Sequence, residues 1–262
     1  MNNLIEYHFK KALAFLGFGD CEVFWSLSYC QGDGMAFANS RVNGDGLKQI
    51  VRKLFYAKDY NYFAKYIDQG LGLTINQSGH YYHCNSMTVD VDWDQMRDFE
   101  AELPESIYKT LENRACELRD EVNEYVKSVS KQLEDDGYAI IAGTPCESEP
   151  DIVREYKTRG FTVRVQKLHD DAPDVFSDCE DDKWSLIQDI ISGRNQFYHL
   201  QVVVLDEYDD VIGKATLFNM IGCSQTEDRS IYGERLSLAK EAIAQARISL
   251  ADGSGEPEAK AA

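Results

Sequence analysis

Residues 94–135 carry the longest helical periodicity in the chain. Apolar side chains recur along this stretch every three or four residues, which places them near one face of a helix. The apolar positions are Met96, Phe99, Leu103, Ile107, Leu111, Leu118, Val122, Tyr125, Val129 and Leu133. Because proline disrupts a helix interior, Pro104 predicts a short helix before it and a long one after it.

Residues 81–93 give the clearest strand pattern. Met87, Val89, Val91 and Trp93 alternate with Thr88, Asp90, Asp92 and Asp94. This period of two is typical of a strand with one buried and one exposed face. Residues 22–29, 35–37 and 71–76 are further strand candidates, and residues 1–17 and 44–67 have helical periodicity.

The rest of the chain alternates in the same way. We expect helices at residues 149–158, 183–192 and 230–251, and strands at residues 161–168, 197–205 and 211–220. Short hairpins and helices in separate runs favour an α+β fold, with antiparallel sheets and helices packed on them. We predict two α+β units: a domain over residues 1–168 and a smaller unit (helix, hairpin, helix) over residues 183–252. An acidic linker at 169–182 would join them, and residues 253–262 would form a disordered tail.

The chain is strongly acidic. Its 262 residues include 45 acidic and 27 basic side chains, a formal charge of −18. Such a surface repels nucleic acid and anionic membranes, so we expect no direct binding of either. No apolar run approaches the roughly 20 residues of a membrane span, and the N-terminus lacks a secretory layout. Seven scattered cysteines without a CxxC pair fit reduced thiols, so we expect a cytoplasmic protein.

The segment SYCQGDGMAF, residues 28–37, raises the first question about chemistry. Gly32 and Gly34 can adopt positive φ, and the Asp33 side chain can hydrogen-bond its own turn, which favours a turn between strands. A catalytic Asp33 would need an acid or base partner. Cys30 would need a neighbouring histidine to become a useful thiolate, and none is local.

The segment SGHYYHCNSM, residues 78–87, contains the metal-ligand types His80, His83 and Cys84. In a strand His80 and His83 point to opposite faces, because their separation is odd. Only a turn or bulge would let both reach one ion, so a hairpin end is the favoured interpretation. A metal site formed by Asp33, His80 and His83 remains the alternative.

Carboxylates gather in two places. Asp90, Asp92 and Asp94 would stand about 7 Å apart along one face of a strand, close to the phosphate repeat of a nucleic-acid strand. Asp98 and Glu102 continue this series. Residues 169–182 carry seven acidic side chains and no basic one; Asp170, Asp171, Asp178, Glu180, Asp181 and Asp182 are the candidate binding residues among them. A solvated face is the plain interpretation, and mimicry of DNA is the functional one.

Familiar enzyme signatures are missing. NGDGLKQI lacks the phosphate-binding frame, and the chain has no GxSxG elbow, no HExxH and no dinucleotide-binding glycine pattern after a strand. We therefore expect a protein that is not an enzyme, with no catalytic residues and no cofactor.

Three stretches together resemble a group of small proteins encoded by bacteriophages and prophages. SYCQGDGMAF resembles the group's aromatic-SQGDGA-aromatic segment, and GHYYHCNSM resembles its GHYxHE segment. GYAIIAGTPCESEPDIVREYKTRGFTV resembles its acidic helix followed by an aromatic-containing strand. The resemblance covers about residues 1–165 and departs at Cys84, where the group more often has glutamate. It implies a phage or mobile-element accessory protein that acts in the bacterial cytoplasm.

These observations lead to one preferred function and two rivals. The preferred one is a non-enzymatic acidic protein that binds and inhibits a host protein with a basic, nucleic-acid-binding surface, such as an anti-phage defence factor. The first rival is a small enzyme or metal-binding protein with its site at the QGDG turn and the HYYH hairpin. The second is a structural or assembly accessory with Tyr60, Tyr62, Tyr66 and Phe197 at its interface.

Overall fold

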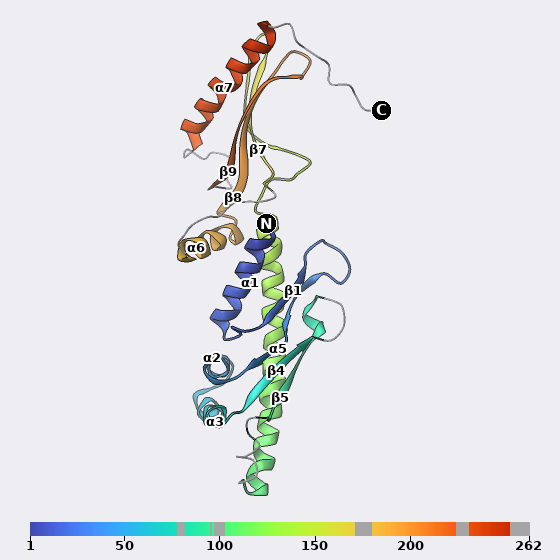
Figure 1. Cartoon of the computed structure of the whole chain (residues 1–262), viewed down its shortest axis with the longest axis vertical. Helices are drawn as coiled ribbons and strands as arrows, with labels where there is room; N and C mark the ends of the chain where they lie inside the picture. The colour runs from blue at the N-terminus through green and yellow to red at the C-terminus, as the bar shows by residue number, and fades with distance from the viewer. Residues whose placement is uncertain (78–81, 95, 97–102, 171–179, 224–230, 252–262) are drawn as a thin grey trace. The chain divides into compact units, whose positions relative to one another are not determined.

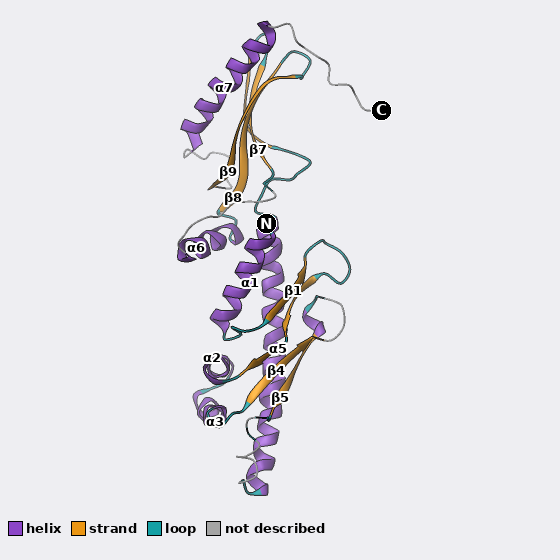
Figure 2. Ribbon diagram, viewed as in Figure 1, coloured by secondary structure: helices purple, strands orange, loops and turns teal. Residues whose placement is uncertain are grey.

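The protein has an α+β fold, as predicted (Figures 1 and 2). The computed structural model describes residues 1–77, 82–94, 96, 103–170, 180–223 and 231–251. These residues form six α-helices and three antiparallel sheets of two, three and four strands.

The chain forms two compact units that divide between Tyr138 and Ala139. The predicted boundary at residue 168 is therefore misplaced. The strand that ends there, β7 (Thr162–Leu168), pairs along its whole length with β8 (Asn195–Leu205), so both belong to one sheet of the second unit. In the predicted linker at 169–182, residue 170 is buried and residues 180–182 begin a helix. Residues 171–179 and the predicted tail at 253–262 lie outside the described residues.

The first unit contains most of the predicted motifs. Its elements are α1 (Asn2–Leu16), β1 (Glu22–Ser26), β2 (Gly34–Ala38), β3 (Ser40–Val42), α2 (Gly44–Leu54), α3 (Ala57–Ile67), β4 (Gly72–Gln77), the short 3₁₀ helix η1 (Cys84–Ser86), β5 (Met87–Asp92) and α5 (Glu105–Ile141) as far as Tyr138. β1 pairs with β2, and β3, β4 and β5 form a second sheet in that order. The helix expected at residues 44–67 is two helices, because the backbone is extended at Phe55 and Tyr56.

α5 begins directly after Pro104, where the sequence predicted a helix to start. Its apolar stripe is buried, and Ser130 donates a hydrogen bond from within that buried side to the carbonyl of Met35 in β2. Arg114 of α5 forms an ion pair with Asp59 of α3. The buried apolar members are Leu111, Ala115, Leu118, Val122, Tyr125, Val126, Val129 and Leu133. Ile107, expected on the same face, is 44% exposed, so close packing of α5 begins only in its second turn.

The second unit is built on one four-stranded antiparallel sheet. Its elements are β6 (Asp151–Lys157), β7, α6 (Glu180–Ile191), β8, β9 (Val211–Cys223) and α7 (Tyr232–Ala251). The strands lie in the order in which they occur in the chain, β6-β7-β8-β9. Figure 1 shows α7 running alongside the strands of this sheet.

The prediction of a helix at residues 149–158 is wrong, because residues 151–157 form the strand β6. β6 is an edge strand whose side chains are mostly exposed, and a bulge interrupts its pairing between Ile152 and Arg154. Exposure and the bulge together remove the regular alternation that identifies a strand in a sequence. The part of the family-like pattern described as an acidic helix is therefore a strand here.

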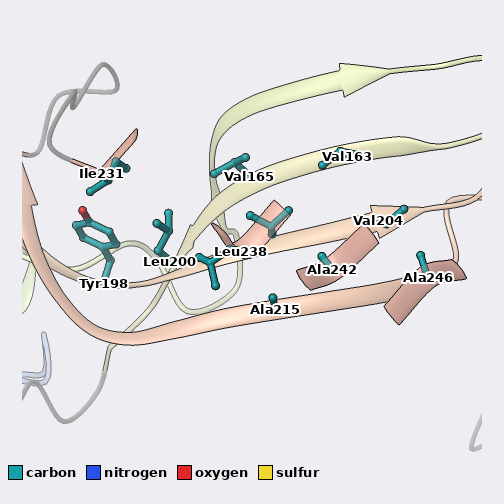
Figure 3. Close-up of a cluster of buried hydrophobic side chains, with 11 residues drawn as sticks. Val163, Val165, Tyr198, Leu200, Val204, Ala215, Ile231, Leu238, Ala242 and Ala246 are labelled. Carbon is teal, nitrogen blue, oxygen red and sulfur yellow. The ribbon is translucent and has the colours of Figure 1, made fainter. Parts of the chain in front are cut away.

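A cluster of buried side chains joins α7 to the sheet (Figure 3). Val163 and Val165 from β7, together with Tyr198 and Leu200 from β8, form its sheet side. Leu238, Ala242 and Ala246 form its helix side. α7 approaches β9 so closely that a Cβ atom on Gly213 would lie 2.3 Å from the carbonyl oxygen of Ala242. Small residues at this contact let the helix backbone lie directly on the strand.

We expect Gly213→Ala to destabilise the second unit by about 1–3 kcal/mol, because the added methyl group forces α7 away from β9. Hydrogen exchange of the β8 and β9 amides, together with urea unfolding, measures this loss. Gly160→Ala is the matched control, because a Cβ atom there meets nothing within 4 Å. Equal stability of the two variants would contradict this account of the contact.

Candidate functional site

The QGDG turn is built around the side chain of Asp33. This residue lies at the end of the connection between β1 and β2, where Ser26 pairs with Gly34. One carboxylate oxygen accepts a hydrogen bond from the Ser26 hydroxyl at 2.6 Å. The other accepts hydrogen bonds from the backbone N–H groups of Ser28 and Cys30, each at 2.7 Å. Three donors from its own turn therefore hold this carboxylate.

These hydrogen bonds also set the ionisation of Asp33. The bond from Ser26, followed by the bond from the Cys30 backbone, lowers the pKa of the carboxyl below its ordinary value. A carboxylate held ionised in this way is a weak base near neutral pH. Its observed role is to close the turn.

The turn lies beside the segment that precedes β5. The backbone N–H of Tyr82 donates to the carbonyl of Gly32 at 3.2 Å. A Cβ atom on Gly34 would lie 2.4 Å from the carbonyl oxygen of Tyr82 and 3.0 Å from the Cα of His83. The φ of Gly34, +150°, also favours glycine. The two family-like motifs therefore meet, and they meet through their backbones.

Side chains of α5 complete the surroundings of the turn. A carboxylate oxygen of Glu134 would lie 3.2 Å from a Cβ atom at Gly34. The ring of Tyr138 packs on that of Tyr29 with 4.6 Å between centroids. Desolvation raises the pKa of Tyr138, and the negative charges of Asp33 and Glu134 raise it further. A carboxyl group with a lowered pKa, Asp33, and a phenol with a raised pKa, Tyr138, are both poor general bases at neutral pH.

The alternative metal site needs Asp33, His80 and His83. Both Asp33 oxygens already accept hydrogen bonds. His83 lies next to the turn, and His80 lies outside the described residues. Across the described ranges, which leave out residues 78–81 among others, no three His, Cys, Asp or Glu side chains are grouped as metal ligands.

The predicted carboxylate ladder on β5 is interrupted by an arginine. Asp92 is only 11% exposed and pairs with the Arg41 Nε at 2.7 Å. The strand ends at Asp92, so Asp94 lies beyond the regular alternation. Asp90 is exposed and accepts a hydrogen bond from Asn76 at 3.1 Å. Asp98 and Glu102 lie outside the described residues. A row of three equivalent surface carboxylates is not what the structure shows.

The acidic run after β7 also differs from the prediction. Asp170 is 1% exposed, so it is not a surface residue. Its carboxylate lies 3.8 Å from the Nδ1 of His199, and its backbone N–H donates to the Thr144 hydroxyl. Glu180, Asp181 and Asp182 form the start of α6, where Asp181 and Asp182 are exposed. Asp171 and Asp178 lie outside the described residues.

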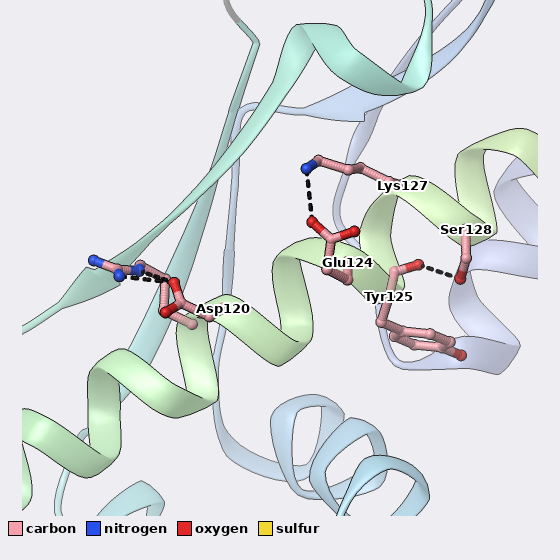
Figure 4. A network of polar contacts seen from close by, with 6 residues as sticks. Asp120, Glu124, Tyr125, Lys127 and Ser128 are labelled. Atoms are coloured by element: carbon pink, nitrogen blue, oxygen red, sulfur yellow. Dashed lines mark hydrogen bonds and ion pairs between the residues drawn. The ribbon is translucent and has the colours of Figure 1, made fainter.

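The structure reveals an acidic side of α5 that was not predicted from the sequence. Glu117, Asp120, Glu121 and Glu124 follow the i, i+3, i+4, i+7 spacing of one helix side, and all four are exposed. Figure 4 shows part of this side. Lys127 reaches Glu124 at 2.8 Å, and Arg119 reaches Asp120 at 2.7 Å. The signal was present in the sequence as acidic positions opposite the predicted apolar stripe.

A second acidic surface is the hairpin tip between β8 and β9, residues 206–210. The Asp206 carboxylate accepts hydrogen bonds from the backbone N–H groups of Tyr208 and Asp210, which fixes the turn. Glu207, Asp209 and Asp210 are exposed, and Tyr208 is 77% exposed. The sequence predicted the two strands on either side of this tip, but its carboxylates were not among the predicted binding residues.

No protein-family model, curated protein or solved structure matches this chain. The candidate surfaces are therefore interpreted from their own geometry. None of the helices in the described part of the chain is both long and apolar enough to cross a membrane.

Two cysteines, Cys21 and Cys146, differ in the pKa of their thiols. The six cysteines in the described residues are free thiols. Burial raises the pKa of Cys21 to about 11. The Ser148 hydroxyl, 3.2 Å away, and nearby backbone N–H groups lower the pKa of the exposed Cys146. Cys146 is therefore expected to hold a larger fraction of reactive thiolate than Cys21.

We expect Asp33→Ala to lower stability at neutral pH. The pKa of Asp33 is lower in the folded protein than in the unfolded chain, where it is about 3.9. Ionised Asp33 therefore stabilises the fold fully above the unfolded pKa, and this stabilisation is lost as the pH falls through the folded pKa. Urea unfolding from pH 7 down to about pH 2.5, the acid end of this window, measures the effect. The free energies of unfolding of the unmodified protein and of Asp33→Ala should converge as the pH falls. Asp20→Ala is the control, because it removes an exposed carboxylate that accepts no hydrogen bond from the described residues. A stability difference that persists in acid would contradict this role.

Iodoacetamide should modify Cys146 faster than Cys21 at about pH 8, because only the thiolate reacts and its fraction is larger at Cys146. Mass spectrometry of peptides taken over time measures both rates. Ser148→Ala should slow the reaction at Cys146 alone. Equal rates at the two cysteines would show that the local hydrogen bonds do not control their reactivity.

Proposed function

We propose that this protein is a non-enzymatic, phage-type accessory protein that acts in the bacterial cytoplasm. It binds a host protein with a basic, nucleic-acid-binding surface and inhibits it by occupying that surface. The observation that carries the proposal is the number of exposed carboxylates in a chain of charge −18, on both units. The likeness of the QGDG and HYYH segments to phage proteins supports the cellular setting.

Two described surfaces are suited to this contact. The acidic side of α5 presents four carboxylates on a rigid helix. The hairpin tip presents three more beside Tyr208, on a turn closed by Asp206. Exposed ion pairs such as Arg119 with Asp120 are worth only about 0–1 kcal/mol. An incoming arginine or lysine can therefore replace the internal cation at little cost.

The mechanism is electrostatic competition. The carboxylates meet the arginine and lysine side chains that otherwise meet phosphate, so the acidic protein and nucleic acid exclude each other. Binding of this kind weakens as salt rises and survives any single conservative carboxylate change. Asp90, Asp181 and Asp182, the exposed members of the originally predicted set, add to the field.

Capture from bacterial lysate tests the proposal. The immobilised protein should retain nucleic-acid-binding proteins at about 50 mM salt and release most of them at about 200 mM, in the way phosphate contacts weaken. Duplex DNA added at low salt should release the same proteins. Retention of no nucleic-acid-binding protein, or retention that duplex DNA does not disturb, would overturn the proposal.

Two triple variants locate the contact. One neutralises the acidic side of α5 (Asp120→Asn, Glu121→Gln, Glu124→Gln), and the other neutralises the hairpin tip (Glu207→Gln, Asp209→Asn, Asp210→Asn). Each removes three negative charges, so each controls for the other's change in total charge. We expect one to weaken capture at least about tenfold more than the other, because contact geometry and not total charge decides binding. Equal, small losses would mean that neither surface makes the contact.

The meeting of the QGDG turn with the Tyr82–His83 segment favours a second candidate, a metal-binding site there. Metal analysis of protein purified without chelator decides it. A stoichiometric metal that is lost in His83→Ala would establish this candidate, and a metal-free protein would remove it.

A further inference from the structure

α7 carries a second apolar stripe in addition to the one that packs on the sheet. Its packing side consists of Leu238, Ala242 and Ala246, which are buried. The second stripe, here called the α7 seam, consists of Tyr232, Leu236, Ile243 and Leu250. The exposed fractions of Tyr232, Leu236 and Leu250 are 56%, 47% and 65%, and Ile243 is partly buried against the core cluster.

The spacing of the seam is that of a helix-pairing surface. Leu236, Ile243 and Leu250 recur every seven residues, the interval of the a positions in a heptad repeat. Tyr232, Ala239 and Ala246 then fall at d positions. Ala239 and Ala246 pack against the core cluster, so the seam runs along the border between α7 and its sheet. Three consecutive a positions give a partner helix about 20 Å of contact along α7.

Cations flank the seam. In the heptad frame Lys240 and Arg247 occupy e positions and Arg235 occupies a g position. Within the described residues none of the three has an ion-pair partner. The guanidinium of Arg235 lies 5.4 Å from the ring centroid of Tyr232, at one end of the seam. β9 and α7 together carry four basic and two acidic side chains, in a chain of charge −18.

The sheet beside the seam adds another cation. Arg154 of β6 pairs in register with Val165, and Tyr156 with Val163, so both side chains lie on the face of the sheet that α7 covers. The Arg154 guanidinium lies 5.0 Å from the Tyr156 ring centroid, and Tyr156 is 47% exposed. Arg154 also has no ion-pair partner among the described residues. The resulting surface is an apolar seam flanked by three cations, with a fourth on the sheet face that α7 covers, and none of the four has an ion-pair partner among the described residues.

These charges argue against pairing of the seam with a second copy of itself. In an antiparallel helix pair, e positions face e positions, so Lys240 and Arg247 would meet Arg247 and Lys240 of the other copy. In a parallel pair, g positions face e positions, so Arg235 would meet Lys240. Both arrangements bring like charges together, which costs binding free energy.

We propose that the α7 seam docks an amphipathic helix of another protein, one whose apolar stripe is flanked by glutamate or aspartate. Leu236, Ile243 and Leu250 would supply the apolar contact, and Lys240, Arg247 and Arg235 would select the acidic flank. This surface is basic and apolar, so it is independent of the acidic contacts proposed above. The protein would thus hold two kinds of partner by opposite chemistry.

Two synthetic helices serve as probes. Each has about 21 residues, three heptads, with leucine at a and d; one carries glutamate at e and g and the other carries lysine. Fluorescence anisotropy of labelled probe with the full chain measures binding. We expect the glutamate probe to bind at least about tenfold more tightly than the lysine probe, since several charge pairs change sign together. Equal binding of the two probes, or no binding of the glutamate probe, overturns the proposal.

Variants of the seam sharpen the result. Leu236→Ser with Leu250→Ser should reduce binding of the glutamate probe at least about tenfold, because two exposed apolar contacts are lost. Ile248→Ser is the matched control: Ile248 is 62% exposed on the same helix but lies about 140° around it from Ile243. Leu236 and Leu250 are both exposed, so the substitutions should not unfold the helix, and circular dichroism of the variants checks this. Equal loss in the control and the seam variant overturns the assignment to the seam.

Charge reversal gives a readout that misfolding cannot mimic. Lys240→Glu with Arg247→Glu should invert the preference, so that the lysine probe binds more tightly than the glutamate probe. An unchanged preference overturns the role of these cations. Light scattering of the unmodified chain supplies a further test, because a dimer that Leu236→Ser with Leu250→Ser dissociates would assign the seam to a second copy instead.

Discussion

Burial of the apolar stripe of α5 is the interaction on which the first unit depends. The stripe extends over most of a 37-residue helix, and each of its fully buried side chains contributes about 1.5–3 kcal/mol relative to an exposed one. Ser130 fixes the position of β2 against the helix through the Met35 carbonyl. Because Gly34 begins β2, this same contact sets where the QGDG turn lies. At Gly34 the turn lies close to the Tyr82–His83 backbone and to the Glu134 carboxylate.

Strong periodic signals were sufficient to predict α5, β5 and the α+β class, since burial on one face imposes a regular pattern on the sequence. The same argument explains the failures. β6 lies at the sheet edge with mostly exposed side chains and a bulge, so burial imposes little pattern on it. The boundary between units depends on which distant strands pair, and the pairing of β7 with β8 leaves no local trace in residues 162–168.

The candidate site residues also differ in whether their contacts are local or distant in the sequence. The role of Asp33 was predictable because it depends on residues within the same turn, Ser26, Ser28 and Cys30. The loss of Asp92 from the acidic ladder was not, since Arg41 reaches it across an intervening strand. Burial of Asp170 beside His199 likewise joins segments far apart in the sequence. Hydrogen bonds within a turn can be predicted from neighbouring residue types, whereas the pairing of a charge with a distant residue depends on tertiary contacts.

Net charge therefore indicates a class of partner but does not identify a surface. Some carboxylates of this acidic chain are bound internally, Asp92 by Arg41 and Asp33 by its turn, and among those that remain exposed two groups lie on α5 and on the β8–β9 hairpin tip. The basic side chains also differ in whether they have ion-pair partners. Arg114, Arg119 and Lys127 are paired along α5, whereas Arg235, Lys240 and Arg247, beside an exposed apolar stripe, have no ion-pair partner in the part of the chain that the structure describes. A cation without an ion-pair partner among the described residues is available to a carboxylate of another protein, and the heptad spacing beside it favours a carboxylate carried by a helix.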